Sequence, residues 1–478
     1  MIRREKIEAW APIAALVVLS FAFRLPPLVN AASTNSDAAV VGLQALHIGR
    51  GELSFFLLGS TYQTSVDSFV AAFFFAIFGA TPRALMLSSL SLHVGVTLVT
   101  YAILARLLGR SRAFALSLLL VFTTASVHSY ALYPPREASI AIAFAAIFLL
   151  DRAFAGKDTL LAAACAVASF ACFADPYAFV LMPLVAVVAL FAVLQPNAKA
   201  ERARRLAFAI GGGLVGAIPL AILFLQSRSN QGELGVDSSR IVHNAHVFAE
   251  SAWPWLVGTT PFVPAHMMDY GPWKLPALFV PIAWLGATAF ALGLVLGPLF
   301  ALRSEIEPKL RAFALGAAAT IVVTLGGYAT SVMVFDHFSM RYLASLVLVA
   351  PFAFAPIAAR VDLRRLAFVL APILLTTAIT GWVSYGPDIS GLRIVREPGA
   401  STDDYALGEA LRAKGVHAAY ADYWVSYRLT FLYREDPLVV PTHASQDRYA
   451  PYRARVKAAP LVAYVIDPLR SEETVEVV

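Results

Sequence analysis

Charged residues are scarce in this sequence. They make up 14% of its 478 residues, whereas hydrophobic residues make up 59%, and the mean hydropathy is +0.69. This composition excludes a soluble globular domain of such length. The net charge is +6, but the basic residues lie between apolar segments. There they indicate membrane topology rather than binding to nucleic acid.

Cysteine is also scarce, and paired ionisable residues are missing from the apolar segments. Cys165 and Cys172 lie seven residues apart in one apolar segment, so the sequence implies no disulfide framework and leaves the redox compartment open. His93 is the clearest ionisable residue inside a segment. Proton-coupled transporters usually need paired acids or bases near the midplane, on broken helices in two related halves. The stretch "GGGLVGAIP" from Gly211 has no counterpart elsewhere, and close packing of small residues explains it more simply.

What the sequence does contain is a series of apolar runs. Eleven of them are candidate spanning helices, near residues 9–29, 84–105, 113–131, 138–151, 159–174, 177–194, 206–226, 275–302, 311–334, 342–359 and 366–385. The first run follows charged residues and precedes small ones, as in a secretory signal peptide. Because it continues to Leu28 and ten further runs follow, a signal anchor is the simpler interpretation. The predicted fold is an all-α polytopic membrane protein with its N-terminus inside.

A further apolar segment, "SFVAAFFFAIFG" at residues 68–79, is only twelve residues long. With eleven spans, the predicted cytoplasmic connections carry 18 Lys and Arg residues, and the external connections before the C-terminal tail carry 8. If residues 68–79 crossed the bilayer, every later connection would change sides and this bias would reverse, against the positive-inside rule. We therefore expect a re-entrant helix that enters the outer interface without crossing.

The C-terminal tail differs in composition from the rest of the chain. In it, "DDYALGEALRAKG" and "YRARVKAA" predict helices, whereas "VHAAYAD", "PLVVPT" and "LVAYVID" predict strands. We expect a transmembrane domain at residues 1–387 and a small external α/β domain at 388–478. The aromatic and arginine-rich segment "YADYWVSYRLTFLYRED" suits contact with a carbohydrate or an acceptor, although packing of a small domain on the membrane portion explains it equally well.

Nearly all unusual polar residues fall on the predicted external connections. This placement suits an enzyme that takes a sugar from a lipid-phosphate carrier, because one carboxylate base and one or two cationic groups on the leaving phosphate would be enough. Arg341 is a good phosphate candidate, since Arg binds phosphate oxygens in a bidentate way. The candidate substrate-binding residues are Tyr62, Gln63, Asp67, Arg136, Glu137, Asp175, His337 and Arg341.

Each candidate also has a purely structural interpretation. Ser36 or Asp37 could cap the helix that begins there, and Asp67 could cap the short helix. Tyr62 and Gln63 could be ordinary polar residues at headgroup depth, and Glu137 could simply favour the dipole of the helix that it begins. Arg136 could extend its charge to the lipid headgroups, and Asp175 with Pro176 could form only a turn.

A divalent metal is the cofactor left open by the sequence. His243 and His246 have i,i+3 spacing, and Asp336 adjoins His337. No set of three or four ligands stands at a recognised spacing, so surface histidines are the favoured interpretation.

The layout of the first 150 residues resembles a known family. One span precedes an external loop that opens with an acid, followed by a short apolar helix ending "FAIFG", then "RAL" and a span closing with "ARLLGRSRAFALSLLL". This layout resembles the GT-C superfamily of membrane glycosyltransferases, and within it the bacterial branch related to protein O-mannosyltransferases and aminoarabinose transferases. The resemblance covers residues 1–390 in layout, with its sequence match concentrated in 37–150 and weaker echoes in "MRYLASLVLVAPFAFAPIA" from Met340.

The resemblance implies that Asp37 is the catalytic base and that the donor is a polyprenyl-phosphate sugar. The sequence departs from the family pattern in two places. Asp37 is followed by Ala38 rather than by a second acid, and "TYQTSVDS" replaces a Lys-Pro-Pro segment. The identities of the donor sugar and the acceptor therefore do not carry over.

We thus predict an inverting glycosyltransferase of the inner (plasma) membrane with its active face outside. Its partners would be the polyprenyl-phosphate donor, a glycan, lipid or protein acceptor, and membrane lipids, but not nucleic acid. The alternative is a lipid or glycan transporter or flippase without bond chemistry, and a third hypothesis is a non-catalytic scaffold for cell-envelope assembly.

Overall fold

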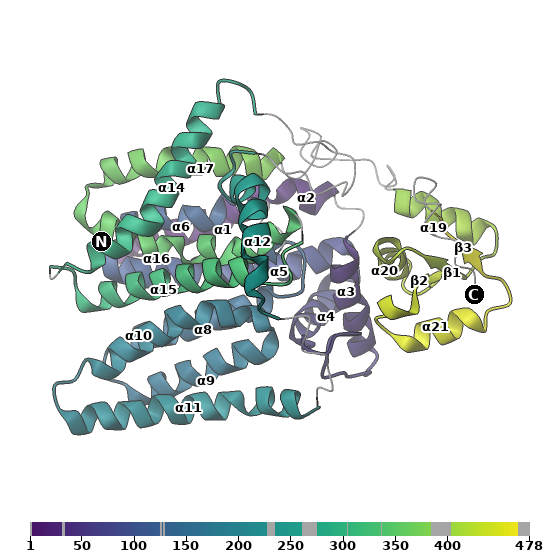
Figure 1. The fold of residues 1–478 in the computed structure, drawn as a ribbon, viewed down its shortest axis with the longest axis horizontal. Coiled ribbons are helices and arrows are strands. Elements are labelled where there is room, and N and C mark those ends of the chain that lie inside the picture. The colour runs from purple at the N-terminus through teal and green to yellow at the C-terminus, as the bar shows by residue number, and fades with distance from the viewer. Residues whose placement is uncertain are drawn as a thin grey trace. The chain divides into compact units, whose positions relative to one another are not determined.

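The protein forms two compact units of mainly helical structure (Figure 1). The computed structural model describes residues 2–30, 34–124, 127, 130–226, 235–260, 275–303, 305–335, 337–383 and 403–466. Unit 1 comprises Met1–Pro27, Leu90–Ala131 and Arg136–Leu392. Unit 2 comprises Leu28–Ser89, Leu132–Pro135 and Arg393–Val478.

Unit 1 is a bundle of apolar helices. Its long helices are α1 (Ile2–Phe23), α5 (Pro82–Leu108, which begins in unit 2), α6 (Arg110–Val121), α8 (Glu137–Ala153), α9 (Asp158–Ala174), α10 (Met182–Leu194), α11 (Lys199–Gln226), α14 (Val280–Ala301), α15 (Pro308–Thr330), α16 (Ala344–Arg360) and α17 (Leu363–Val383). The short elements are α2 (Leu25–Asn30, which runs from unit 1 into unit 2), η1 (Pro176–Leu181), η3 (Ser238–Arg240), α12 (Ile241–Val247), η4 (Phe248–Ala252), α13 (Trp253–Val257) and η5 (His337–Leu343).

The helices agree with the predicted polytopic fold. Seven of the described helices are long and apolar enough to cross a membrane: Pro82–Leu108, Pro176–Leu194, Lys199–Ile222, Val280–Ala301, Pro308–Thr330, Phe338–Arg360 and Leu363–Trp382. The other four predicted spans coincide with α1, α6, α8 and α9, which fall short of that length or hydropathy. The helical membrane fold is therefore confirmed, and eleven crossings stay a prediction.

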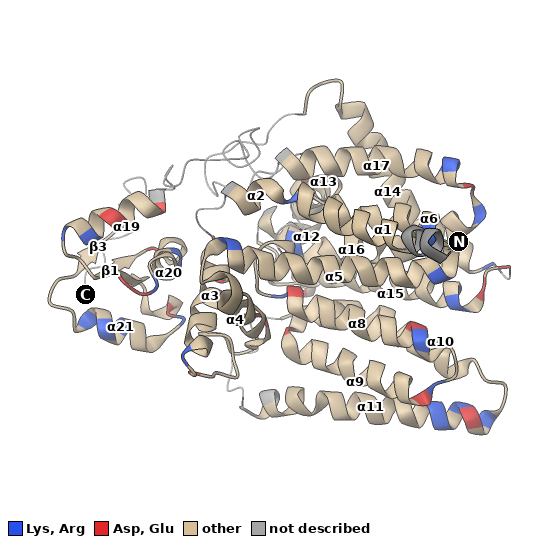
Figure 2. Cartoon of the chain, turned by 180° about the vertical axis from the view of Figure 1, so that it is seen from behind, with Lys and Arg blue, Asp and Glu red and all other residues tan. Residues whose placement is uncertain are grey.

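Basic residues gather at one end of the unit 1 bundle (Figure 2). At this end lie the connections α5–α6, α8–α9, α10–α11, α14–α15 and α16–α17. These are the connections that the charge count assigns to the cytoplasm.

Helices α9 and α11 are in backbone contact through two glycines. A Cβ atom on Gly212 would lie 2.0 Å from the carbonyl oxygen of Ala162, and one on Gly216 would lie 2.0 Å from that of Ala166. The glycine-rich stretch lies inside the continuous helix α11. Small residues here allow the close helix approach that is common in membranes, and the helix is not broken.

Unit 2 combines two helices that follow the first span with the C-terminal α/β structure. Its elements are α3 (Ser36–Gly49), α4 (Val66–Phe78), α19 (Asp403–Ala413), β1 (Ala418–Ala421), α20 (Tyr423–Leu432), β2 (Leu438–Pro441), η6 (Ala444–Gln446), α21 (Ala450–Lys457) and β3 (Ala463–Tyr464). The strands form a parallel sheet in the order β2-β1-β3. The predicted helices and strands of the tail are present, and α20 is an additional helix within the aromatic segment.

The core of unit 2 joins α3 to the C-terminal elements. Gly42 of α3 lies against the ring of Phe431 in α20, where an added Cβ would be only 2.6 Å from a ring carbon. Helix α4, with 13 residues, exposes Phe69, Phe73 and Ile77 on one side. The predicted short helix is thus present, and such a helix is too short to span a bilayer. Its place in the outer interface stays a prediction.

A buried ionic network fastens the end of α3 to the C-terminal elements. Glu435 accepts hydrogen bonds from His47 Nε2 (2.7 Å), Arg50 Nη1 (2.8 Å) and the Tyr452 hydroxyl (2.5 Å). Burial alone would raise the pKa of Glu435, but these three donors outweigh it and lower the pKa to about 2. The carboxylate is therefore ionised at neutral pH and holds segments almost 400 residues apart in sequence.

Candidate active site

The start of α3 leaves the carboxylate of Asp37 free of capping. Asn35 is the N-cap, and its side-chain oxygen accepts from the backbone N–H of Ala38 at 2.8 Å. The Ser36 hydroxyl lies 2.8 Å from the carbonyl oxygens of both Tyr423 and Trp424. The capping alternatives for Ser36 and Asp37 are therefore wrong, because Asn35 performs that role.

Asp37 lies in a group that we call the aspartate cluster, with Tyr423 of α20 and Arg448. The Tyr423 hydroxyl donates to Asp37 Oδ1 at 2.6 Å, and Arg448 Nε donates to the same hydroxyl at 3.1 Å. Arg448 Nη2 is 3.8 Å from Asp37 Oδ1. Among the described residues, none donates a hydrogen bond to Asp37 Oδ2. The side chain of Asp37 is 38% exposed, so this oxygen is open to a proton donor from outside.

The protonation of the two neighbours fixes their roles as donors. Burial, followed by the negative charge of Asp37, raises the pKa of Tyr423 far above its ordinary value. Burial would lower the pKa of Arg448, but Tyr423 and Asp37 outweigh it and the pKa is raised. Tyr423 thus keeps its proton and Arg448 its charge, and together they orient Asp37 through one oxygen.

Three of the predicted substrate-binding residues, which fall in the segment between α3 and α4 and the first turn of α4, lie in unit 2. Gly59, with φ of +66°, is in close backbone contact with Arg448, where a Cβ would lie 2.4 Å from the Arg448 Cα. Nearby Tyr62 is half-buried and contributes to the electrostatic environment of Arg448. Gln63 and Asp67 are buried, and Asp67 lies in the first turn of α4. Since Ser65 is the N-cap of α4, the interpretation of Asp67 as that cap is wrong.

Three other predicted residues, Arg136, Asp175 and Arg341, come together in unit 1. With Tyr130 and Tyr342 they form a group that we call the arginine cluster. Arg136 donates to the Tyr130 hydroxyl at 3.0 Å, and its Nε is 3.8 Å from Asp175 Oδ1. Arg341 donates to the Tyr342 hydroxyl at 3.3 Å. Both guanidinium groups lie near the ring of Tyr342, at 5.9 and 5.2 Å from its centroid.

The arginine cluster holds two cations and one acid. Asp175 is buried, and its Oδ1 accepts from the backbone N–H of Tyr177 at 2.7 Å, so it also caps η1. Among the described residues, Arg341 has no acidic partner, and its buried Nε has no hydrogen-bond partner. A half-buried cation with an unpaired Nε has a donor left for an anion such as phosphate.

The backbone of Arg136 is strained at the point where it enters this cluster. Its φ of 109° is in the left-handed region, which costs a non-glycine residue about 1–3 kcal/mol. The next residue, Glu137, is buried and begins α8. Strain of this kind often occurs at functional sites, where the surrounding structure maintains it.

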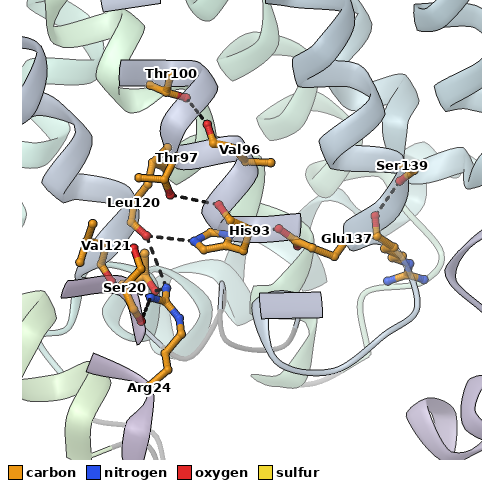
Figure 3. A network of polar contacts seen from close by, with 12 residues as sticks. Ser20, Arg24, His93, Val96, Thr97, Thr100, Leu120, Val121, Glu137 and Ser139 are labelled. Carbon is orange, nitrogen blue, oxygen red and sulfur yellow. Dashed lines mark hydrogen bonds and ion pairs between the residues drawn. The ribbon is translucent and has the colours of Figure 1, made fainter. Parts of the chain in front are cut away.

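The side chain of Glu137 points toward His93 (Figure 3). Its Oε1 is 3.0 Å from His93 Nδ1, and His93 Nε2 donates to the Leu120 carbonyl at 2.9 Å. Buried Arg24 donates to the carbonyl of Val121 at 3.0 Å, next to this pair. The structure therefore gives Glu137 and His93 places in an internal network that joins three helices.

The remaining candidates are His337 and the residues considered for a metal. The backbone of His337 begins η5, but its side chain and the whole of Asp336 lie outside the described residues. In the part of the chain that the structure describes, no three His, Cys, Asp or Glu side chains are grouped as they would be around a metal ion.

The sequence did not single out Tyr130, Tyr342, Tyr423 or Arg448 as site residues. Tyr423 lies in the aromatic segment whose composition suited acceptor contact, so a weak signal existed for it. Arg448 carries no local motif, because its contact with Asp37 joins residues about 400 positions apart.

The helical bundle, the short helix α4 and the small C-terminal α/β structure define a polytopic membrane protein. The fold is shared with ArnT from Cupriavidus metallidurans bound to undecaprenyl phosphate, at a TM-score of 0.56 and 13% identity over 95% of this chain and 89% of ArnT. The predicted resemblance is thus confirmed at the level of the fold.

Other solved structures are more distantly similar. Apo ArnT matches with a TM-score of 0.48 and 13% identity, over 96% of this chain and 90% of that chain. The oligosaccharyltransferase of Archaeoglobus fulgidus, tethered with an acceptor peptide, matches with a TM-score of 0.47 and 11% identity, over 92% of this chain and 65% of its own. No protein-family model matches the chain, and no curated protein matches its sequence.

Proposed function

We propose that this protein is an inverting membrane glycosyltransferase. It moves a sugar from a polyprenyl-phosphate carrier to a hydroxyl group of a glycan, lipid or protein acceptor, on the outer face of the inner (plasma) membrane. The observation that carries the proposal is the state of Asp37: one carboxylate oxygen is held by Tyr423 and the other is open.

Asp37 acts as the general base in this reaction. The acceptor oxygen attacks the anomeric carbon, its proton passes to Asp37 Oδ2, and the bond between that carbon and the phosphate oxygen breaks. Attack from the side opposite the phosphate inverts the anomeric configuration. Tyr423 and Arg448 hold the carboxylate in one orientation, which is the positioning that a general base needs.

The arginine cluster stabilises the negative charge that develops on the leaving phosphate. The electron pair of the broken bond leaves with the polyprenyl phosphate, whose oxygens become more negative in the transition state. Arg341 offers its Nε, which has no partner among the described residues, and Arg136 adds a second guanidinium beside the same tyrosine ring. Such preorganised cations stabilise a phosphate leaving group.

The carrier is proposed from the shared fold. ArnT of the same fold was solved with undecaprenyl phosphate bound. A lipid phosphate also agrees with a site whose charged groups lie next to apolar helices. Asp67, Tyr62 and Gln63 are proposed to position substrate, because they lie in the same unit as Asp37, between the end of α3 and the first turn of α4.

The test uses the purified full chain with polyprenyl-phosphate sugars that differ in the sugar. Release of free polyprenyl phosphate that requires an acceptor would support the enzyme. Movement of intact donor across a vesicle membrane without release would support the flippase alternative instead. The anomeric configuration of the product, read by NMR, separates inversion from retention.

A further inference from the structure

A separate cavity of about 660 Å³ lies among the ends of α5, α8, α10 and α15 in unit 1. Its polar lining includes Arg106, Arg152, Asp151 and Lys309. We propose that this cavity binds the phosphate headgroup of an anionic phospholipid. The proposal concerns none of the residues of the aspartate or arginine clusters and does not depend on the proposed transfer reaction.

A buried acid fixes two of the cations in the cavity wall. Asp151 is 2% exposed and forms ion pairs with Arg106 and, at 2.7 Å, with Lys309 Nζ. A buried carboxylate between two cations is compensated and holds both side chains in place. The cations are therefore presented to the cavity in a fixed arrangement, instead of extending freely into water.

Because a third cation, Arg152, lines the cavity, the lining carries an excess of positive charge. Arg152 packs at 5.2 Å from the ring centroid of Phe148 and has no acidic partner among the described residues. Glu307 is the second acid of the lining. Three cations thus face two acids, and the difference matches a ligand with a single negative charge.

The remaining walls distinguish a lipid from a free anion. Phe154, Phe191 and Leu194 also line the cavity, and Leu194 is exposed at the end of α10. Aromatic and aliphatic walls next to a cationic wall suit a molecule with an acyl chain and a phosphate. Inorganic phosphate would gain nothing from them.

The position in the bundle favours the same ligand. The residues that line the cavity belong to the α5, α8, α10 and α15 helix ends. Basic residues gather at this end of unit 1 (Figure 2), which the positive-inside rule assigns to the cytoplasmic surface. Anionic lipids enrich that surface, and basic pockets between transmembrane helices bind their headgroups.

The experiment measures lipid binding to the delipidated full chain in detergent by native mass spectrometry. The probes are phosphatidylglycerol and phosphatidylcholine with identical acyl chains. We expect preferential retention of phosphatidylglycerol, and about fivefold weaker retention by Arg152→Gln, as one cation near the surface contributes about that factor. Arg152→Lys keeps the charge and should retain most of the binding.

The matched control is Arg364→Gln, at an exposed cation of α17 that does not line the cavity. Equal retention of the two lipids, or equal loss with Arg364→Gln and Arg152→Gln, would overturn the proposal. Displacement of the lipid by inorganic phosphate at an equal concentration would also overturn it, because the apolar walls would then contribute nothing.

Discussion

The aspartate cluster and the arginine cluster contain the same kinds of side chain in different proportions: one acid and one cation in the first, one acid and two cations in the second. Asp37 is 38% exposed and keeps one oxygen open. The side chain of Asp175 is 3% exposed and accepts from a backbone N–H at the start of η1. The difference teaches that a carboxylate near an arginine is suited to proton transfer only where its partners leave an oxygen accessible. Where its partners enclose it, the acid has a structural role.

The largest expected effect comes from neutralising the open acid. Asp37→Asn retains the size and the hydrogen-bond acceptor for Tyr423 but cannot take a proton. Transfer should fall by about 10²- to 10⁴-fold, the usual range for loss of a general base, while thermal unfolding stays unchanged. Release of polyprenyl phosphate measures the effect.

Asp422→Asn is the matched control for this substitution. Asp422 caps α20 in the same unit through a bond from the backbone N–H of Trp424, and Asn can replace that cap. Near-normal transfer by Asp37→Asn would remove Asp37 from the mechanism and return the chain to the flippase or scaffold hypotheses.

The next effect tests the cationic cluster. Arg341→Gln should lower transfer by about 10²-fold, as is typical when one preorganised donor to a developing anion is lost. Arg136→Gln should cost less, because Arg136 already shares its charge with Asp175. Measured kcat and KM for the donor separate loss of transition-state stabilisation from loss of binding.

Arg240→Gln provides the control for the arginines, since Arg240 donates to the Val334 carbonyl outside the cluster. If Arg240→Gln and Arg341→Gln reduced transfer equally, the loss would be explained by a general structural effect, and the phosphate-binding role of Arg341 would be wrong.

A smaller effect is expected from the hydroxyl that orients Asp37. Tyr423→Phe removes the 2.6 Å hydrogen bond and should slow transfer about tenfold, in line with the loss of one bond to a charged group. Tyr433→Phe is the comparison variant, because that hydroxyl bonds Glu409 and the Tyr405 carbonyl instead. Unchanged kinetics for Tyr423→Phe would show that the carboxylate needs no support from the C-terminal elements.

The smallest effect on transfer should come from Glu435, whose role is to hold unit 2 together. Its pKa is lowered from 4.5 to about 2, so its stabilisation is present above the unfolded value and is lost as the pH falls from about 5 to about 2. Glu435→Gln should therefore lower the melting temperature at pH 7 and lose less stability on acidification than the natural protein.

Thermal unfolding at pH 3, 5 and 7 measures this difference. The exposed Glu52, which also pairs with His47, supplies the control Glu52→Gln with little change at any of these pH values. Parallel pH curves for Glu435→Gln and the natural protein would contradict the assignment.

Local pattern was sufficient to predict most of the elements. Each of the eleven apolar runs coincides with a helix, and the alternation in the tail predicted β1, β2 and β3. Helix α20 was not predicted, because its apolar residues do not follow a clear helical period. In the structure it packs against α3. Likewise, Asn35 rather than Ser36 or Asp37 became the N-cap, since neighbouring residues with equal capping ability cannot be ranked without the backbone.

By itself, the sequence determined that this protein is a helical membrane protein with a small α/β tail, because hydrophobic length and periodicity are local properties that the bilayer and the backbone impose. The tertiary structure alone decided which polar residues meet. Asp37 and Arg448, or Arg136 and Arg341, lie hundreds of residues apart along the chain. Only folding, which brings distant segments together to bury their apolar faces, determines that one carboxylate stays open and that Glu137 is enclosed with His93.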